Sequence, residues 1–304
     1  MEKSSVVVSL GGSEEGYKEF VSDSFWVQVW DQYRRHIMSM IGAVILVVMA
    51  LAALAAPLFA GDPTAIDLSP ENRLQAPTDS HVFGTDNLGR DVLARSMFGA
   101  RISLTIGFVS SGLAITIGTI FGSIAGFYGG LLDDLMMRII DLILSLPLLF
   151  VLIILQSMLE NPGLTSVILV IGITSWMGTA RVVRGEILKE REIEYVEAVR
   201  ALGASPARII IRHLVPNIIG PVIVISTLQV GRAIILEAAL SYLGFGTQPP
   251  NHSWGSMLAE ARSYLATGPW MAIFPGLLLS VTVLSFNFVG DGLASALNPF
   301  ERKT

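Results

Sequence analysis

Long apolar stretches that contain no charged residue dominate the chain. Six such runs occur, at 41–60, 102–132, 142–159, 161–180, 214–231 and 263–290. A helix that crosses the hydrocarbon core of a bilayer needs about 20 mostly apolar residues, so each run has roughly the length of one crossing. The pattern therefore predicts an all-α membrane protein with six transmembrane helices in residues 37–300. The expected connections are two long loops on one side, 61–101 and 241–269, and one on the other, 181–216.

A different pattern precedes the first run. Phe25, Trp26, Val29, Trp30 and Tyr33 recur at helical spacing within residues 1–36. An amphipathic helix of this kind lies along a membrane surface, with its aromatic side chains at the depth of the lipid headgroups. We expect such a surface helix in the N-terminal tail, and a short tail at 301–304.

The distribution of basic residues predicts the orientation of the chain. Six crossings place both termini on one side, together with fourteen of the lysines and arginines, and the opposite side holds five: Arg73, Arg90, Arg95, Arg101 and Arg262. Cytoplasmic segments carry the excess of basic residues, so both termini are expected in the cytoplasm. The net charge of −5 argues against nucleic acid as a partner, and the chain has no cysteine for disulfides or thiolate metal sites.

Several kinds of catalytic site are missing from the sequence. None of the four lysines follows a glycine, so the chain lacks the Gly-Lys-Ser/Thr of a phosphate-binding P-loop. The four histidines are far apart and form no metal-binding pair, and no nucleophile elbow is present. We expect no catalytic residue, no metal and no cofactor in this chain.

Glycines recur every four residues in the second run. Gly118, Gly122, Gly126 and Gly130 would form one stripe on a helix, which lets a neighbouring helix approach closely. The ladder predicts close helix packing rather than a ligand site.

Few polar residues fall near or within the spans. The candidates for a translocation path are Gln229, Arg232, Glu237 and Asn287, with Arg232 and Glu237 expected at the outer end of the fifth helix. Each has an alternative as a snorkelling charge, a locally paired charge or an interhelical hydrogen-bond partner. Asp141 is expected to pair with Arg138, three residues earlier.

The segment 181–213 has more structure than a simple connection needs. A helix is expected at 192–202, with Tyr195, Val199 and Leu202 on one face. Gly203 can adopt the left-handed conformation that ends a helix, and Ser205 followed by Pro206 fits the start of the next helix. Two short helices joined by a tight turn would form a compact hairpin before the chain re-enters the membrane at Pro216.

These residues carry a family resemblance. Glu197-Ala198-Val199, Gly203 and Pro216-Asn217 resemble the EAA loop of bacterial ABC-importer permeases, with Val199 at the usual third alanine. The run from Phe83-Gly84-Thr85-Asp86 to Gly89-Arg90-Asp91-Val92, and the run from Leu243-Gly244-Phe245-Gly246 to Ser253-Trp254-Gly255, look like the peptide/nickel branch of that family. The resemblance covers about residues 24–300 and is closest to the C-type subunits of dipeptide and oligopeptide importers.

The resemblance implies a type I ABC-importer permease fold and a role without catalysis. The implied partners are a second, related permease, two P-loop ATPase subunits that bind ATP and Mg, and an extracytoplasmic substrate-binding protein, in a bacterial or archaeal cytoplasmic membrane. The hairpin would dock on an ATPase and transmit its closure to the pore. The residues implied in this coupling are Tyr195, Glu197, Ala198, Arg200, Gly203, Ala204, Ser205 and Pro216.

Three alternatives stay open. The same machine could carry nickel, glutathione or another solute in place of di- or oligopeptides. An ion-coupled secondary transporter would need no ATPase, but such proteins often show internal repeats and charges at the membrane midplane. A membrane-bound enzyme would need a cluster of titratable residues, which the sequence does not reveal.

Overall fold

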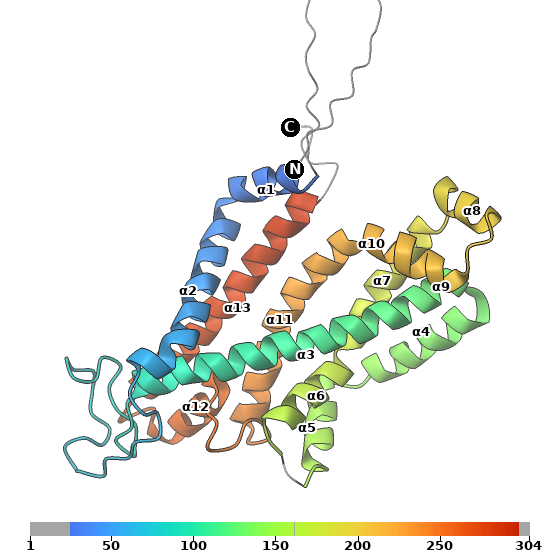
Figure 1. Cartoon of the computed structure of the whole chain (residues 1–304). Coiled ribbons are helices and arrows are strands. Elements are labelled where there is room, and N and C mark those ends of the chain that lie inside the picture. The colour runs from blue at the N-terminus through green and yellow to red at the C-terminus, as the bar shows by residue number, and fades with distance from the viewer. Residues whose placement is uncertain (1–24, 161, 298–304) are drawn as a thin grey trace, which may run out of the picture.

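The computed structural model describes residues 25–160 and 162–297, and the regular structure of these residues is helical (Figure 1). The predicted tail at 301–304 and the start of the N-terminal tail lie outside the described residues. The long helices are α2 (Ile37–Phe59), α3 (Val92–Tyr128), α11 (Ile219–Tyr242) and α13 (Trp270–Leu297). The shorter helices are α1 (Phe25–Arg35), α4 (Gly130–Leu144), α5 (Leu148–Ser157), α6 (Leu164–Thr174), α7 (Trp176–Glu190), α8 (Glu194–Ala201), α9 (Pro206–Ile209), α10 (Val215–Asn217) and α12 (Trp254–Ala261).

The described residues contain five helical segments that are long and apolar enough to cross a membrane, one of which is α6 continued by α7. Helices α4 and α5 are bent by 82° relative to each other, and they add a sixth crossing if the pair forms one broken span. The predicted third span, 142–159, is therefore wrong as a single helix. Pro147 lies at the bend, and proline cannot donate the backbone hydrogen bond that would continue the helix.

Several helices extend past the first charged residue, where the uncharged runs end. The fifth span is 219–242 rather than 214–231, so Arg232 lies near the middle of α11 and not at its outer end. Helix α7 likewise continues to Glu190. Asp141 pairs with Arg181 of α7 instead of Arg138, and Asp133 pairs with Arg184 at 2.5 Å. The partners on α7 compensate the charges of Asp133 and Asp141. A count of apolar residues along the sequence cannot detect such pairs between helices.

Helix α3 is the centre of the bundle and packs against α2, α6, α7 and α11. Its closest neighbour is α7, because Gly118, Gly122 and Gly126 face that helix without side chains. A methyl group on Gly122 would lie 2.5 Å from the carbonyl oxygen of Ala180. The predicted packing stripe is confirmed for these three glycines. It is wrong for Gly130, which begins α4 and has open space around it.

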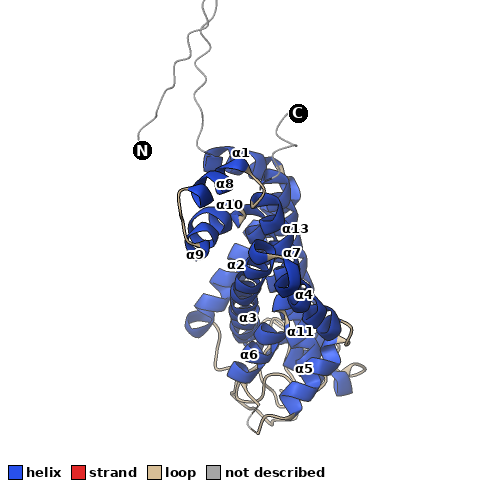
Figure 2. Ribbon diagram, turned by 90° about the vertical axis from the view of Figure 1, so that its right-hand side faces the viewer, coloured by secondary structure: helices blue, strands red, loops and turns tan. Residues whose placement is uncertain are grey.

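The helices place the functional segments at two opposite ends (Figures 1 and 2). The hairpin end holds α1, the end of α13, and α8 to α10; the loop end holds residues 61–91, α5 and α12. Helix α1 has the predicted amphipathic character, since Val29 and Tyr33 pack with Ala296 of α13 while the rings of Trp26 and Trp30 are exposed. The first and last described residues therefore lie at the same end, as an even number of crossings requires.

Candidate functional site

The hairpin (residues 191–218) has the predicted two short helices. Helix α8 ends at Ala201, and Gly203 adopts a left-handed conformation with φ of +82° in open space. Helix α9 begins at Pro206, and a π-helical turn and α10 then lead into α11. Ser205 occupies the position before α9, but its hydroxyl makes no capping hydrogen bond, so that detail of the prediction is wrong.

The base of the hairpin is anchored on α7. Val196 of α8 and Ile209 of α9 are buried in one apolar cluster with Val183 and Ile187 of α7. Arg191 also donates from Nη1 to the carbonyl oxygen of Gly126 at 2.8 Å, which joins the hairpin to the end of α3. Because the cluster is shared, α8 and α7 are expected to move together.

Tyr195 faces inward and braces this base. Its hydroxyl donates to the carboxylate of Glu190 at 3.2 Å and accepts a hydrogen bond from Asn217 at 2.7 Å. The bond to Asn217 links α8 to the segment that contains Pro216. Tyr195 and Val199 pack on the apolar cluster as predicted, whereas Leu202 does not share their face: its side chain is 87% exposed.

The outer surface of the hairpin consists of small, charged and apolar side chains. Glu197, Ala198 and Arg200 are exposed, and Ala204 is partly buried. Arg200 lies over the ring of Phe127 at 5.7 Å, and within the described residues no ion pair joins it to Glu197. Ala198 and Leu202, four residues apart in the sequence, are both exposed.

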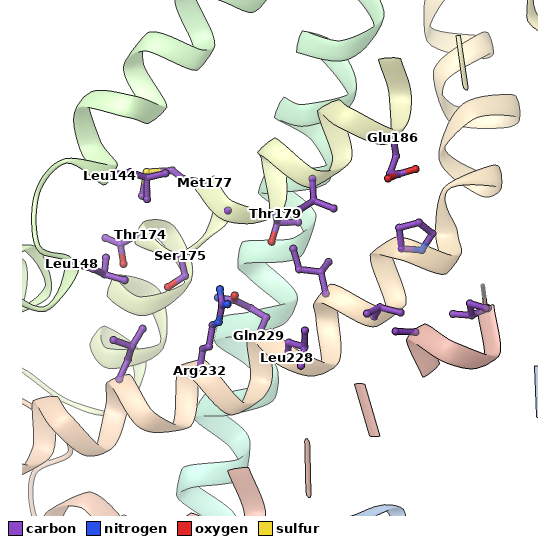
Figure 3. Close-up of a pocket in the computed structure, with 18 of the residues that line it drawn as sticks. Leu144, Leu148, Thr174, Ser175, Met177, Thr179, Glu186, Leu228, Gln229 and Arg232 are labelled. Atoms are coloured by element: carbon purple, nitrogen blue, oxygen red, sulfur yellow. The ribbon is translucent and has the colours of Figure 1, made fainter. Parts of the chain in front are cut away.

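A cavity of about 850 Å³ opens beside α7 and α11 (Figure 3). Its walls come from the end of α6, from α7, α11 and the α4–α5 bend, and from the end of α13. Most of the lining is apolar. The polar side chains of the lining are Thr174, Ser175, Thr179, Glu186, Lys189, Gln229 and Arg232.

Two of the four predicted path residues line this cavity and two do not. Gln229 and Arg232 face it, while Asn287 is not among its lining residues. Glu237 is fully buried elsewhere, where its Oε1 accepts hydrogen bonds from Ser241 at 2.6 Å and from Thr247 at 3.3 Å. Glu237 thus fastens the loop after α11 to the helix and does not contact the cavity.

Sequence reasoning missed the hydroxyl residues of the cavity. Thr174, Ser175 and Thr179 lie in an apolar run, at or near the break between α6 and α7, and all three line the cavity. Their polar character within a span was the available signal.

A second polar cluster, also missed, lies at the loop end. Asp86 is fully buried and accepts hydrogen bonds from Arg90 and Arg95, both at 2.6 Å. Glu260 of α12 accepts from the same two arginines at 2.8 Å. Burial and the neighbouring Arg95 lower the pKa of His252 to about 4, and Arg95 lies 3.3 Å from its Nδ1. This cluster joins the loop 61–91 to α12.

Comparison with known families assigns the chain. Residues 118–303 match the family described as binding-protein-dependent transport system inner membrane component. Residues 24–77 match the N-terminal transmembrane domain of oligopeptide transport permease C. The chain belongs to this family of transport permeases, and the predicted relationship is confirmed.

Individual relatives agree with this assignment. The oligopeptide transport system permease protein OppC of Bacillus subtilis is 42% identical over 92% of this chain and 91% of its own length. The dipeptide transport permease DppC of Alkalihalophilus pseudofirmus is 38% identical over 92% of each chain. The glutathione transport permease GsiD of Pectobacterium atrosepticum is 37% identical over 90% of this chain and 91% of its own length.

A solved structure confirms the predicted fold class. A chain from the inward-facing MetNI methionine ABC transporter aligns with a TM-score of 0.55 at 21% identity, covering 68% of this chain and 96% of that chain. The type I ABC-importer permease fold is therefore the fold of this protein.

Proposed function

We propose that this protein is one of two permease subunits of an ATP-driven importer of di- and oligopeptides. The family membership and the peptide-transport relatives support this proposal. In this proposal the other permease is a related chain, and two P-loop ATPase subunits bind ATP and Mg below the membrane. An extracytoplasmic binding protein delivers the peptide from above, and this chain catalyses no chemical step.

The observation that carries the proposal is the path from the hairpin to the cavity through one helix. Val183 and Ile187 of α7 hold the hairpin, while Thr179 and Val182 of the same helix line the cavity. A displacement of the hairpin therefore tilts a wall of the cavity. Closure of the ATPases on ATP would push the hairpin and convert the cavity between inward- and outward-facing states, which is alternating access.

This mechanism assigns the hairpin end to the cytoplasm, since ATP is cytoplasmic. Both chain ends would then be cytoplasmic, in agreement with the excess of basic residues at that end. The loop end, with residues 61–91 and α12, would meet the binding protein. The membrane would be the cytoplasmic membrane of a bacterium or an archaeon.

Glutathione is the second candidate cargo, because the GsiD relative is nearly as similar as the dipeptide relative. Glutathione is itself a small peptide, so the assembly and the mechanism would be the same. Competition between labelled dipeptide and unlabelled glutathione for uptake separates the two candidates.

ATP-dependent uptake of a labelled dipeptide by cells that lack other peptide importers tests the proposal. Ala198→Arg adds a large charge to the exposed face of α8, and Gly203→Pro cannot adopt the observed φ of +82°. Both variants are expected to abolish uptake and to remain in the membrane at wild-type amounts. Ala198→Ser, which keeps a small side chain at the same site, is expected to transport normally. Undiminished uptake by Ala198→Arg would contradict docking through this face.

A further inference from the structure

One charged side chain lies in the cavity near the middle of a spanning helix. Arg232 follows Ile219, the first residue of α11, by 13 positions and precedes Tyr242, the last, by 10. At 1.5 Å per residue, these intervals place it about 20 Å and about 15 Å from the two ends of the helix. Ionisable residues inside a membrane span generally serve a transported substrate, a proton or an ion.

The charge of Arg232 is not compensated by this chain. Within the described residues, no carboxylate lies within ion-pairing distance of its guanidinium. Glu186, which also lines the cavity, accepts a hydrogen bond from Lys189 at 2.8 Å. Glu237 is one turn away on α11 but is buried with Ser241 outside the cavity. Arg232 therefore places a positive charge in the cavity that no carboxylate of the described residues neutralises.

Polar groups without partners surround this cation. Figure 3 shows Arg232 and Gln229 of α11 pointing toward the side of the cavity formed by Thr179 and Ser175. Ser175 is partly buried, and its hydroxyl has no hydrogen-bond partner within the described residues. Buried hydroxyls are normally hydrogen-bonded, so the Ser175 hydroxyl lacks a partner that a molecule in the cavity could supply.

The apolar part of the lining limits what that molecule can be. Leu148, Met177, Leu228 and Leu236 are among the residues that form walls around the polar groups. A small hydrophilic anion such as phosphate would leave these walls without contacts. The molecule that fits has a carboxylate at one end, hydrogen-bonding groups along its length and side chains of variable polarity. It would contact both the polar groups and the apolar walls of the cavity.

We infer that Arg232 binds the C-terminal carboxylate of the peptide in transit, with Gln229 and Ser175 as hydrogen-bond partners of its terminal residues. The guanidinium presents two parallel N–H groups that match the geometry of a carboxylate. Each peptide with a free C-terminus carries that group, so this contact is independent of peptide sequence. The inference rests on the proposed function, because it names the part of the peptide that this permease contacts.

The test compares trialanine with trialanine amide, which lacks the C-terminal charge. Uptake of each labelled peptide is measured in proteoliposomes with the complete transporter and its binding protein, for the wild type, Arg232→Gln and Arg232→Lys. For each variant, the uptake of trialanine is divided by the uptake of trialanine amide, and this ratio is compared with the wild-type ratio. Because the binding protein is the same throughout, its own preference cancels in this comparison. Arg138→Gln, which changes an exposed arginine outside the cavity lining, is the control.

Arg232→Gln is expected to lower trialanine uptake about tenfold or more, as expected for the loss of a charge-assisted hydrogen-bond pair, and to leave trialanine amide uptake unchanged. Arg232→Lys keeps the charge without the two-pronged geometry, so its ratio should lie between those of the glutamine variant and the wild type. Arg138→Gln should keep the wild-type ratio.

Two results would overturn the inference. An equal loss of both peptides in Arg232→Gln would mean that the guanidinium serves the assembly, for example by pairing with a carboxylate of the second permease. Unchanged uptake of both would mean that it does not meet the cargo. A wild-type transporter that takes up neither peptide would instead refute the proposed peptide function, and this assignment with it.

Discussion

The contact between α3 and α7 gives a sharp prediction, because Gly112 and Gly122 lie on the same helix in different surroundings. A methyl group on Gly122 would meet the Ala180 carbonyl oxygen at 2.5 Å and the Val183 Cβ at 2.9 Å. A methyl group on Gly112 would meet nothing within 4 Å. The alanine variants of the two positions therefore differ in packing and not in the type of substitution.

The magnitude follows from two opposing effects. Replacing glycine by alanine within a helix favours folding by up to about 1 kcal/mol, and this gain applies to both variants. At Gly122, however, α7 must withdraw by about 1 Å to restore normal contact distances, and overpacking of this kind costs about 1–3 kcal/mol. We expect Gly122→Ala to be less stable than Gly112→Ala by about 1–3 kcal/mol.

Reversible unfolding in mixed detergent micelles, followed by tryptophan fluorescence or circular dichroism, measures this difference in the free energy of unfolding. Equal stabilities of the two alanine variants would refute the close approach of α3 and α7 at this point. Because α7 also carries the hairpin, Gly122→Ala should in addition reduce transport more than Gly112→Ala does.

Two further predictions concern the polar cluster at the loop end. Asp86→Asn leaves Arg90 and Arg95 with one carboxylate in a buried site. It should therefore destabilise the protein by about 3–5 kcal/mol in the same unfolding assay. The control is Asp134→Asn at an exposed site, which should change stability by less than about 1 kcal/mol. The pKa of His252 in the folded protein is lowered to about 4 from an ordinary value of 6.5. Between these two pH values the unfolded chain binds more protons than the folded protein, so stability should fall as the pH falls from about 6.5 to 4. His252→Gln should flatten this part of the pH profile, and an unchanged slope in that variant would exclude His252 as its source.

Hydropathy and spacing were sufficient for five of the membrane helices and for the hairpin. An apolar run of about 20 residues favours a membrane helix, because within the bilayer each backbone polar group must be satisfied inside the segment. Gly203 and Pro206 have backbone preferences so strong that the turn and the start of α9 follow from them directly. These features depend on local sequence alone.

Features that depend on partners far along the chain could not be predicted in this way. The inward face of α8 contains Val196 rather than Leu202, because α7 and α9 decide which side is covered. Glu237 and Arg232 were both expected at a helix end, yet one is buried among hydroxyls and the other faces the cavity. The bend at Pro147 was missed for a different reason: the proline is a local signal, but hydropathy alone does not change there.

The assembly itself gives the most direct test of the central claim, that this chain is the permease to which ATPases attach. The tagged protein is purified in mild detergent, and the proteins that accompany it are identified by mass spectrometry. We predict recovery of a second permease and of P-loop ATPases from the wild type and from Ala198→Ser, with loss of the ATPases from Ala198→Arg. Recovery of this chain alone, under conditions that keep a known importer complex intact, would contradict the account.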